Sequence, residues 1–176
     1  MDIRQDVRCL APLPAEAILC ELAARFRTLQ SDDQVASALG KEHFVDATAT
    51  PIYQALCNID PLPPAYKESM LLFRDGQNRY GVLDLAFHSH SLKNARVQVL
   101  YDTSVLSRLF GTVKRAVLDR FTPLLSDLTE NRAYERRGDV DLWLGPDGMV
   151  VGVRLMRDGV SVYLMDRSVS GWDNLP

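Results

Sequence analysis

The stretch over residues 139–166 constrains the fold most, because it has the pattern of a three-stranded antiparallel meander. Residues 145–148, Gly-Pro-Asp-Gly, predict a first turn, and residues 157–159, Arg-Asp-Gly, predict a second. Glycine supplies the positive φ that tight turns need, while proline and aspartate favour the start of a turn. Between the turns the side chains alternate with a period of two, which is typical of strands. The rest of the chain is therefore expected to cover this sheet.

One face of the predicted meander is entirely apolar and is expected to be core. It comprises Val140, Leu142, Leu144, Met149, Val151, Val153, Leu155, Val160, Val162 and Leu164. The opposite face is mixed and comprises Asp139, Asp141, Trp143, Val150, Gly152, Arg154, Met156, Ser161, Tyr163 and Met165. Either a helix from elsewhere in the chain partly covers this mixed face, or a partner binds it. Large amphipathic side chains are enriched at interfaces, so the predicted partner-binding residues are Trp143, Arg154, Met156, Tyr163 and Met165.

Composition narrows the classes of partner and compartment. A chain of 176 residues has the length of one domain, or of one domain with a small lobe. Its net charge of −3 disfavours a nucleic-acid partner, because such proteins usually carry a basic surplus. Cys9, Cys20 and Cys57 form no Cys-x-x-Cys motif, so we expect buried, reduced thiols. We see neither a signal peptide nor an apolar stretch of about 20 residues, and we therefore expect a cytoplasmic protein with no membrane contact.

The N-terminal third has the pattern of helices. Apolar residues at helical spacing predict a helix over residues 15–29, and Ser31 with Gln34 predicts the cap of a second helix that ends at Gly40. Thr50 and Pro51 predict the start of a third helix. Three prolines within residues 60–64 then indicate a boundary. We expect a helical N-terminal lobe over residues 1–60, packed on an α+β body over 65–167, and a loose tail over 168–176.

The body combines two three-stranded units with a long helix between them. A hairpin over residues 70–74 and 79–88 and a third strand over 96–101 precede a helix whose apolar stripe includes Phe110 and Phe121. The fold class is therefore α+β: an N-terminal helical lobe packed on an antiparallel sheet of about six strands. Over residues 66–167 this order of elements resembles that of PAS-like, profilin-like and roadblock-like domains and of type III secretion chaperones. The resemblance implies a small α+β sheet.

Two groups of residues are candidates for metal chemistry. Asp84, His88 and His90 would share one face of an extended strand, and a His-x-His pair with a carboxylate can bind zinc or iron. The alternative is two polar residues that close a strand before a turn over 91–94. Asp139 and Asp141 form a pair that could hold Mg²⁺, but no phosphate-binding loop accompanies them. Glycine motifs for nucleotides and Gly-x-Ser-x-Gly elbows are absent from the sequence.

These patterns favour a non-enzymatic protein-binding module without a cofactor. We expect a bacterial immunity, adaptor or chaperone-like protein that holds a protein partner on its mixed sheet face. One alternative is a PAS-like small-ligand sensor with a cavity between the sheet and the long helix. The other is a metal-dependent hydrolase that uses Asp84, His88 and His90. Exposed sheet edges would also allow the chain to pair as a homodimer.

Overall fold

Eight strands form one antiparallel sheet in the order β1-β2-β3-β4-β8-β7-β6-β5. The structure is a computed structural model that describes residues 7–51, 66–76, 79–100, 112–129, 134–156 and 159–170. The strands are β1 (Phe44–Asp46), β2 (Tyr66–Arg74), β3 (Tyr80–His88), β4 (Ser91–Leu100), β5 (Tyr134–Arg137), β6 (Val140–Leu144), β7 (Met149–Leu155) and β8 (Gly159–Asp166). The principal helices are α2 (Ala15–Arg25), α3 (Asp32–Leu39), α6 (Thr112–Thr129) and α7 (Arg167–Ser170).

The α+β class with an antiparallel sheet is confirmed, but the prediction of about six strands was wrong in detail. The two additional strands are β1 and β5, which lie at opposite edges of the sheet and span only three and four residues. The two predicted three-stranded units form one continuous sheet, because β4 pairs with β8. The predicted third strand also begins earlier than expected, at Ser91, because the chain reverses already at residues 89–90.

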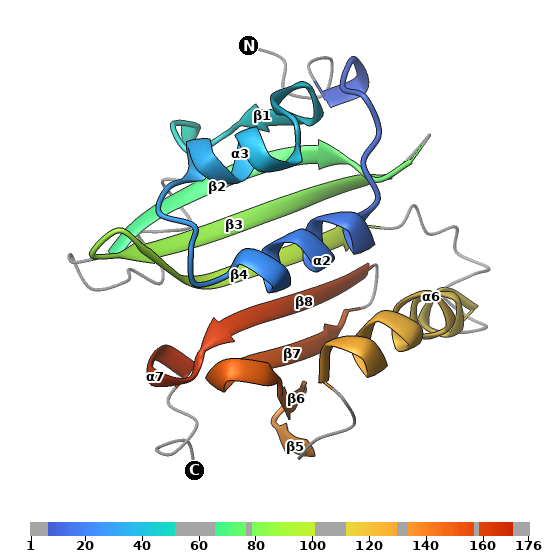
Figure 1. Cartoon of the computed structure of the whole chain (residues 1–176). Coiled ribbons are helices and arrows are strands. Elements are labelled where there is room, and N and C mark those ends of the chain that lie inside the picture. Colours follow the sequence, from blue (N-terminus) through green and yellow to red (C-terminus); the bar gives the residue numbers. More distant parts are fainter. Residues whose placement is uncertain are drawn as a thin grey trace.

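The helices α2, α3 and α6 share one hydrophobic core with a single face of the sheet, which we call the inner face (Figure 1). In the view of Figure 1 the helices α2 and α3 lie in front of β2, β3 and β4. The fully buried members of the core are contributed by α2, α3, α6 and the five strands β2, β3, β4, β7 and β8. They include Ile18, Leu19, Leu22, Val35, Phe73, Leu83, Val97, Phe121, Val151, Val162 and Leu164. The opposite side of the sheet is called the outer face below.

Helix α2 buries the side that its apolar spacing predicts. Ile18, Leu19 and Leu22 are fully buried, as expected for one stripe of a helix against a sheet. The prediction that Cys20 packs on this buried side was wrong, because its side chain is exposed on the opposite side of the helix. Cys9 is exposed as well, so the expectation of buried thiols is incorrect for both described cysteines.

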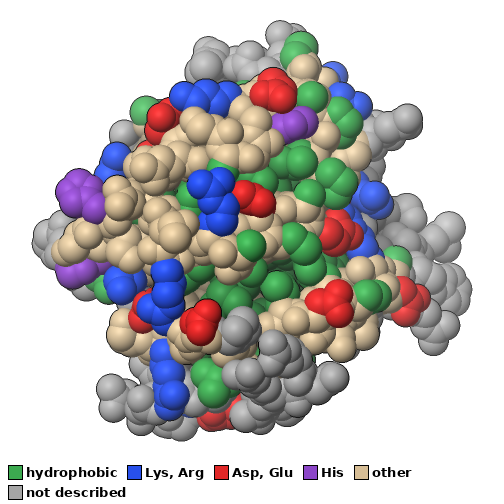
Figure 2. Space-filling model, viewed as in Figure 1, with side chains coloured by type: hydrophobic (Ala, Val, Ile, Leu, Met, Phe, Trp, Pro, Cys, Tyr) green, Lys and Arg blue, Asp and Glu red, His purple; other side chains and the backbone are tan. Residues whose placement is uncertain are grey.

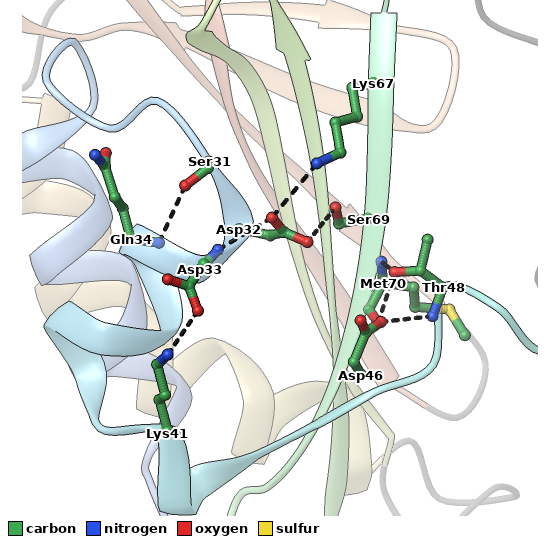
Figure 3. A network of polar contacts seen from close by, with 10 residues as sticks. All are labelled: Ser31, Asp32, Asp33, Gln34, Lys41, Asp46, Thr48, Lys67, Ser69 and Met70. Atoms are coloured by element: carbon green, nitrogen blue, oxygen red, sulfur yellow. Dashed lines mark hydrogen bonds and ion pairs between the residues drawn. The ribbon is translucent and has the colours of Figure 1, made fainter.

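Helix α3 is fixed to the edge of the sheet by polar contacts around its first turn (Figure 3). Ser31 caps the helix as predicted, because its hydroxyl oxygen accepts a hydrogen bond from the Gln34 backbone N–H. Asp32 accepts a hydrogen bond of 2.8 Å from the Ser69 hydroxyl on β2 and lies 3.9 Å from the Lys67 ammonium. These contacts explain how a short helix keeps its place above β2.

A buried polar cluster joins α2, α6 and the turn between β2 and β3. Arg120 of α6 donates to both oxygens of Asp75 at 2.6 Å and also bonds both carboxylate oxygens of Glu16. Asp75 additionally accepts a hydrogen bond of 2.8 Å from the Ala15 backbone N–H and pairs with Arg79. Burial alone would raise the pKa of Glu16, but the hydrogen bonds and charge of Arg120 hold it below its ordinary value. We call these four charged residues the Asp75 cluster.

Asp166 at the end of β8 gathers a second set of partners from distant segments. It accepts a hydrogen bond of 2.9 Å from the Ser168 backbone N–H and lies 3.4 Å from the Lys93 ammonium and 3.8 Å from the Arg27 guanidinium. Burial would raise the pKa of Asp166, but Ser168 and Lys93 together hold it below its ordinary value. Asp166 therefore ties the end of α2 and the start of β4 to the C-terminal strand.

We predict that Asp166→Asn destabilises the fold only where the carboxylate is ionised. The pKa is lower in the folded than in the unfolded chain, so the stabilisation is present above about pH 4 and is lost as the pH falls below it. At neutral pH the substitution should lower the free energy of unfolding by about 1–2 kcal/mol. Urea unfolding at several pH values measures this, and a difference from wild type that persists at low pH would contradict it.

Several sequence expectations lie outside the described residues. They are the third helix beyond Pro51, the boundary over 60–64, Cys57, Phe110 and the tail beyond residue 170. The long predicted helix is described from Thr112 onward, and Pro123 lies inside it without ending it. No described helix is both long enough and apolar enough to cross a membrane.

Candidate functional site

The register between β6 and β7 differs from the predicted one. The difference changes which side chains of β6 share a face of the sheet with those of β7. Gly145 donates to the Met149 carbonyl oxygen at 2.8 Å, so only three residues form the loop, and Leu144 lies opposite Val150. The predicted four-residue loop would have placed Leu144 opposite Met149. A shift of one residue moves every side chain of a strand to the other face. The predicted assignment of β6 was therefore wrong, whereas that of β7 and β8 is confirmed.

Trp143 is the main correction to the predicted partner-binding residues. It lies opposite Val151 on the inner face and packs against the core. Arg154 and Tyr163 lie on the outer face, as does Met165, which is opposite Val150. Met156 follows β7, and its sulfur lies 3.8 Å from both the Gln98 amide nitrogen and the Ser161 hydroxyl. Four of the five predicted residues therefore lie on or beside one surface.

The outer face is not covered by α2, α3 or α6, because all three contribute to the core on the other side. On the helix side, basic and acidic side chains are interspersed among apolar ones (Figure 2). The outer face differs because its strands bring charged groups to the middle and apolar groups to one end. Across the middle, Met70, Asp84, Arg96, Tyr163 and Gly152 lie opposite one another in successive strands.

The middle of the outer face is a set of paired charges. Arg96 donates to Asp84 at 2.7 Å, and Arg154 donates to Asp139 at 2.6 Å. Burial raises the pKa of Asp84, and the charge of Arg96 opposes that rise without overcoming it. The pKa of Arg96 is itself raised, because the attraction and hydrogen bond from Asp84, with Tyr163 contributing, outweigh the effect of burial. Tyr163 also interacts with Arg154, so its side chain links the two ion pairs.

One end of the outer face is apolar, and we call it the apolar end: Leu72, Tyr80, Val82 and Leu100. Tyr80 lies opposite Leu100, and Leu72 lies opposite Val82 in the next row of the same face. Tyr80 and Leu100 are 38% and 39% exposed, and they are the exposed large hydrophobic side chains of the part of the chain that the structure describes. Isolated exposed apolar residues are common, but adjacent ones form a patch of the kind found at interaction sites.

The three metal candidates from the sequence are not brought together. Asp84 is engaged by Arg96, while the His88 ring lies 5.1 Å from the Tyr66 ring. His90 lies in the two-residue turn between β3 and β4 with a φ of 57°. Within the described ranges, no group of three or more histidine, cysteine or acidic side chains is placed to hold a metal ion.

Asp139 and Asp141, at the start of β6, also do not share a site. Asp139 pairs with Arg154, whereas Asp141 lies opposite Val153 on the inner face and 3.7 Å from the Arg136 guanidinium. Their carboxylates therefore face different partners and do not converge on one ion. This arrangement favours ion pairs at the edge of the sheet over a shared Mg²⁺ site.

Sequence reasoning missed Arg96, Tyr80 and Leu100 as members of this surface. The signal was present in β4, because its apolar residues Val97 and Val99 alternate and are buried on the inner face. Alternation then places Arg96 and Leu100 on the other side. What the sequence did not reveal was that β4 and β8 are neighbours, which brings Arg96 beside Tyr163.

Comparison with known proteins adds no family to this description. No protein-family model matches the chain, and no curated protein or solved structure matches it either.

Proposed function

We propose that the chain is a protein-binding module that holds a polypeptide partner on the outer face of its sheet. The observation that carries the proposal is that α2, α3 and α6 pack on the inner face, while on the outer face Arg154 is exposed and Tyr163 and Met165 are half-buried. Tyrosine, arginine and methionine provide large contact areas with polar groups and are enriched at protein interfaces. A bacterial immunity, adaptor or chaperone-like role and a cytoplasmic location are part of the proposal.

Site-specific photo-crosslinking in cells tests this proposal even though the partner is unidentified. A photoreactive amino acid replaces Arg154 on the outer face, and in a matched protein it replaces Ser37, which is exposed on α3 on the helix side. We expect irradiation to give a discrete covalent adduct from position 154 and none from position 37. Adducts from position 37 alone, or from neither position, would overturn the proposal.

The two alternatives stay predictions. A small-ligand sensor requires a cavity between the sheet and the long helix. In the described part of that helix, Phe121 and Leu124 are buried in the core that the helix shares with the sheet. A hydrolase built on Asp84, His88 and His90 receives no support from their arrangement. We therefore favour the protein-binding function over both.

A further inference from the structure

The ion pairs of the outer face determine what kind of partner it fits. Each arginine described in the interior of this face or along its β5 edge already has a carboxylate: Arg96 has Asp84, Arg154 has Asp139, and Arg137 has Glu135 at 2.7 Å. An acidic partner would gain little from these arginines, because it would have to displace an internal carboxylate. A basic partner would likewise have to displace an arginine from Asp84 or Asp139.

The charged side chain described beside the apolar end, that of Arg74, is engaged by the protein's own backbone. Arg74, in the same row as Tyr80 and Leu100, donates to the carbonyl oxygens of Gly76, Arg8 and Leu10 at 2.9–3.3 Å. The amide of Gln98 lies beside the Met156 sulfur. Among the described residues at this end, the large exposed hydrophobic side chains are those of Tyr80 and Leu100.

We infer that the outer face binds an uncharged, apolar polypeptide segment, which lies against Leu72, Tyr80, Val82 and Leu100. This inference rests on the proposed function and specifies its partner. The complementary surface is apolar because the described surface at this end is apolar, and a neutral segment leaves the Arg96–Asp84 and Arg154–Asp139 ion pairs intact. Such binding is driven by burial of apolar surface and does not depend on ionic strength.

A phage-displayed library of random linear peptides tests the chemistry of the partner directly. The full chain selects binders, and fluorescence anisotropy measures the affinity of each synthesised peptide at low and at high sodium chloride. We expect enrichment of apolar, uncharged sequences whose Kd changes by no more than about twofold as salt screens the charges. Leu100→Asp and Tyr80→Asp should each weaken binding by roughly tenfold or more, because the peptide would then bury an unpaired carboxylate.

Ser37→Asp is the matched control, because it adds the same charge at an exposed position of α3 on the helix side. It should leave the Kd unchanged, and urea unfolding of all three variants shows whether the fold is kept. Should either aspartate variant unfold, Leu100→Ser and Tyr80→Ser replace them in the same measurement.

Three results would overturn the inference: selected peptides that are rich in acidic or basic residues, a Kd that rises steeply with salt, or peptides that bind the aspartate variants as tightly as wild type. A library that yields no binder counts against it as well. These failures are distinguishable from failure of the proposed function, because crosslinking from position 154 reports a partner on the outer face whatever its chemistry.

Discussion

Arg120→Met is expected to lower the free energy of unfolding by about 3–5 kcal/mol, because it removes the guanidinium that the Asp75 cluster is built around. The Asp75 side chain is 0% exposed and that of Arg120 is 18% exposed, so water does not replace the lost partner. Asp75 would then keep the Ala15 backbone N–H at 2.8 Å, and among the described cations it would keep the longer contact from Arg79 at 3.5 Å. Urea unfolding monitored by circular dichroism measures the loss.

Arg25→Met provides the matched control, since it makes the same substitution on a helix surface. Arg25 pairs with Glu21 one turn earlier at 3.2 Å, but both side chains are well exposed, at 49% and 37%. Exposed pairs at this spacing contribute at most about 0.5 kcal/mol. Equal losses for the two variants would mean that burial does not strengthen the Asp75 cluster, and our account of it would then fail.

The Asp75 cluster also shows where sequence reasoning reaches its limit. Asp75 has the sequence context of a turn residue, and Arg120 that of one of several basic residues on a helix. They are 45 positions apart in the chain, and no local pattern signals that a helix end will lie beside a hairpin turn. Such contacts follow from the packing of α6 against α2, which is set by the tertiary structure.

Strands with strong alternation were predictable, and short edge strands were not. The strands β7 and β8 follow the expected residues and faces because their apolar side chains recur at every second position. The edge strand β5 reads Tyr-Glu-Arg-Arg and has the composition of a charged connection, since an edge strand needs little burial on either face. The three residues of β1 are too few for any period to appear.

The candidate surface was predicted in part, and the error has a single physical origin. Arg154, Tyr163 and Met165 share the outer face because the pairing of β7 and β8 was correctly inferred. The prediction for Trp143 was wrong because it requires a turn of four residues over 145–148, whereas the Gly145–Met149 hydrogen bond leaves three. Loop length decides the face of a whole strand, and Gly-Pro-Asp-Gly is compatible with both lengths.

A second large loss of stability is expected from substitutions on the inner face. There the Phe73 ring lies directly over Gly81 on the neighbouring strand. A Cβ atom at position 81 would lie 2.1 Å from the ring, so the glycine is required by the ring rather than by a turn. We expect Phe73→Ala to cost about 3–5 kcal/mol through the cavity it leaves. Gly81→Ala should cost about 1–3 kcal/mol, because the fully buried ring has to move.

The double variant is the decisive measurement, because the two costs have opposite physical causes. Once the ring is gone, the methyl group at position 81 has space and fills part of the cavity. The free energy of unfolding that the double variant loses should therefore be smaller than the sum of the two single losses, by about 1 kcal/mol or more. Combining Phe73→Ala with Gly152→Ala is the control, since Gly152 lies on the outer face among Leu142, Tyr163 and Val140, and these two losses should add. Additive losses for the Phe73 and Gly81 pair as well would show that the ring and the glycine are energetically independent, despite the contact between them.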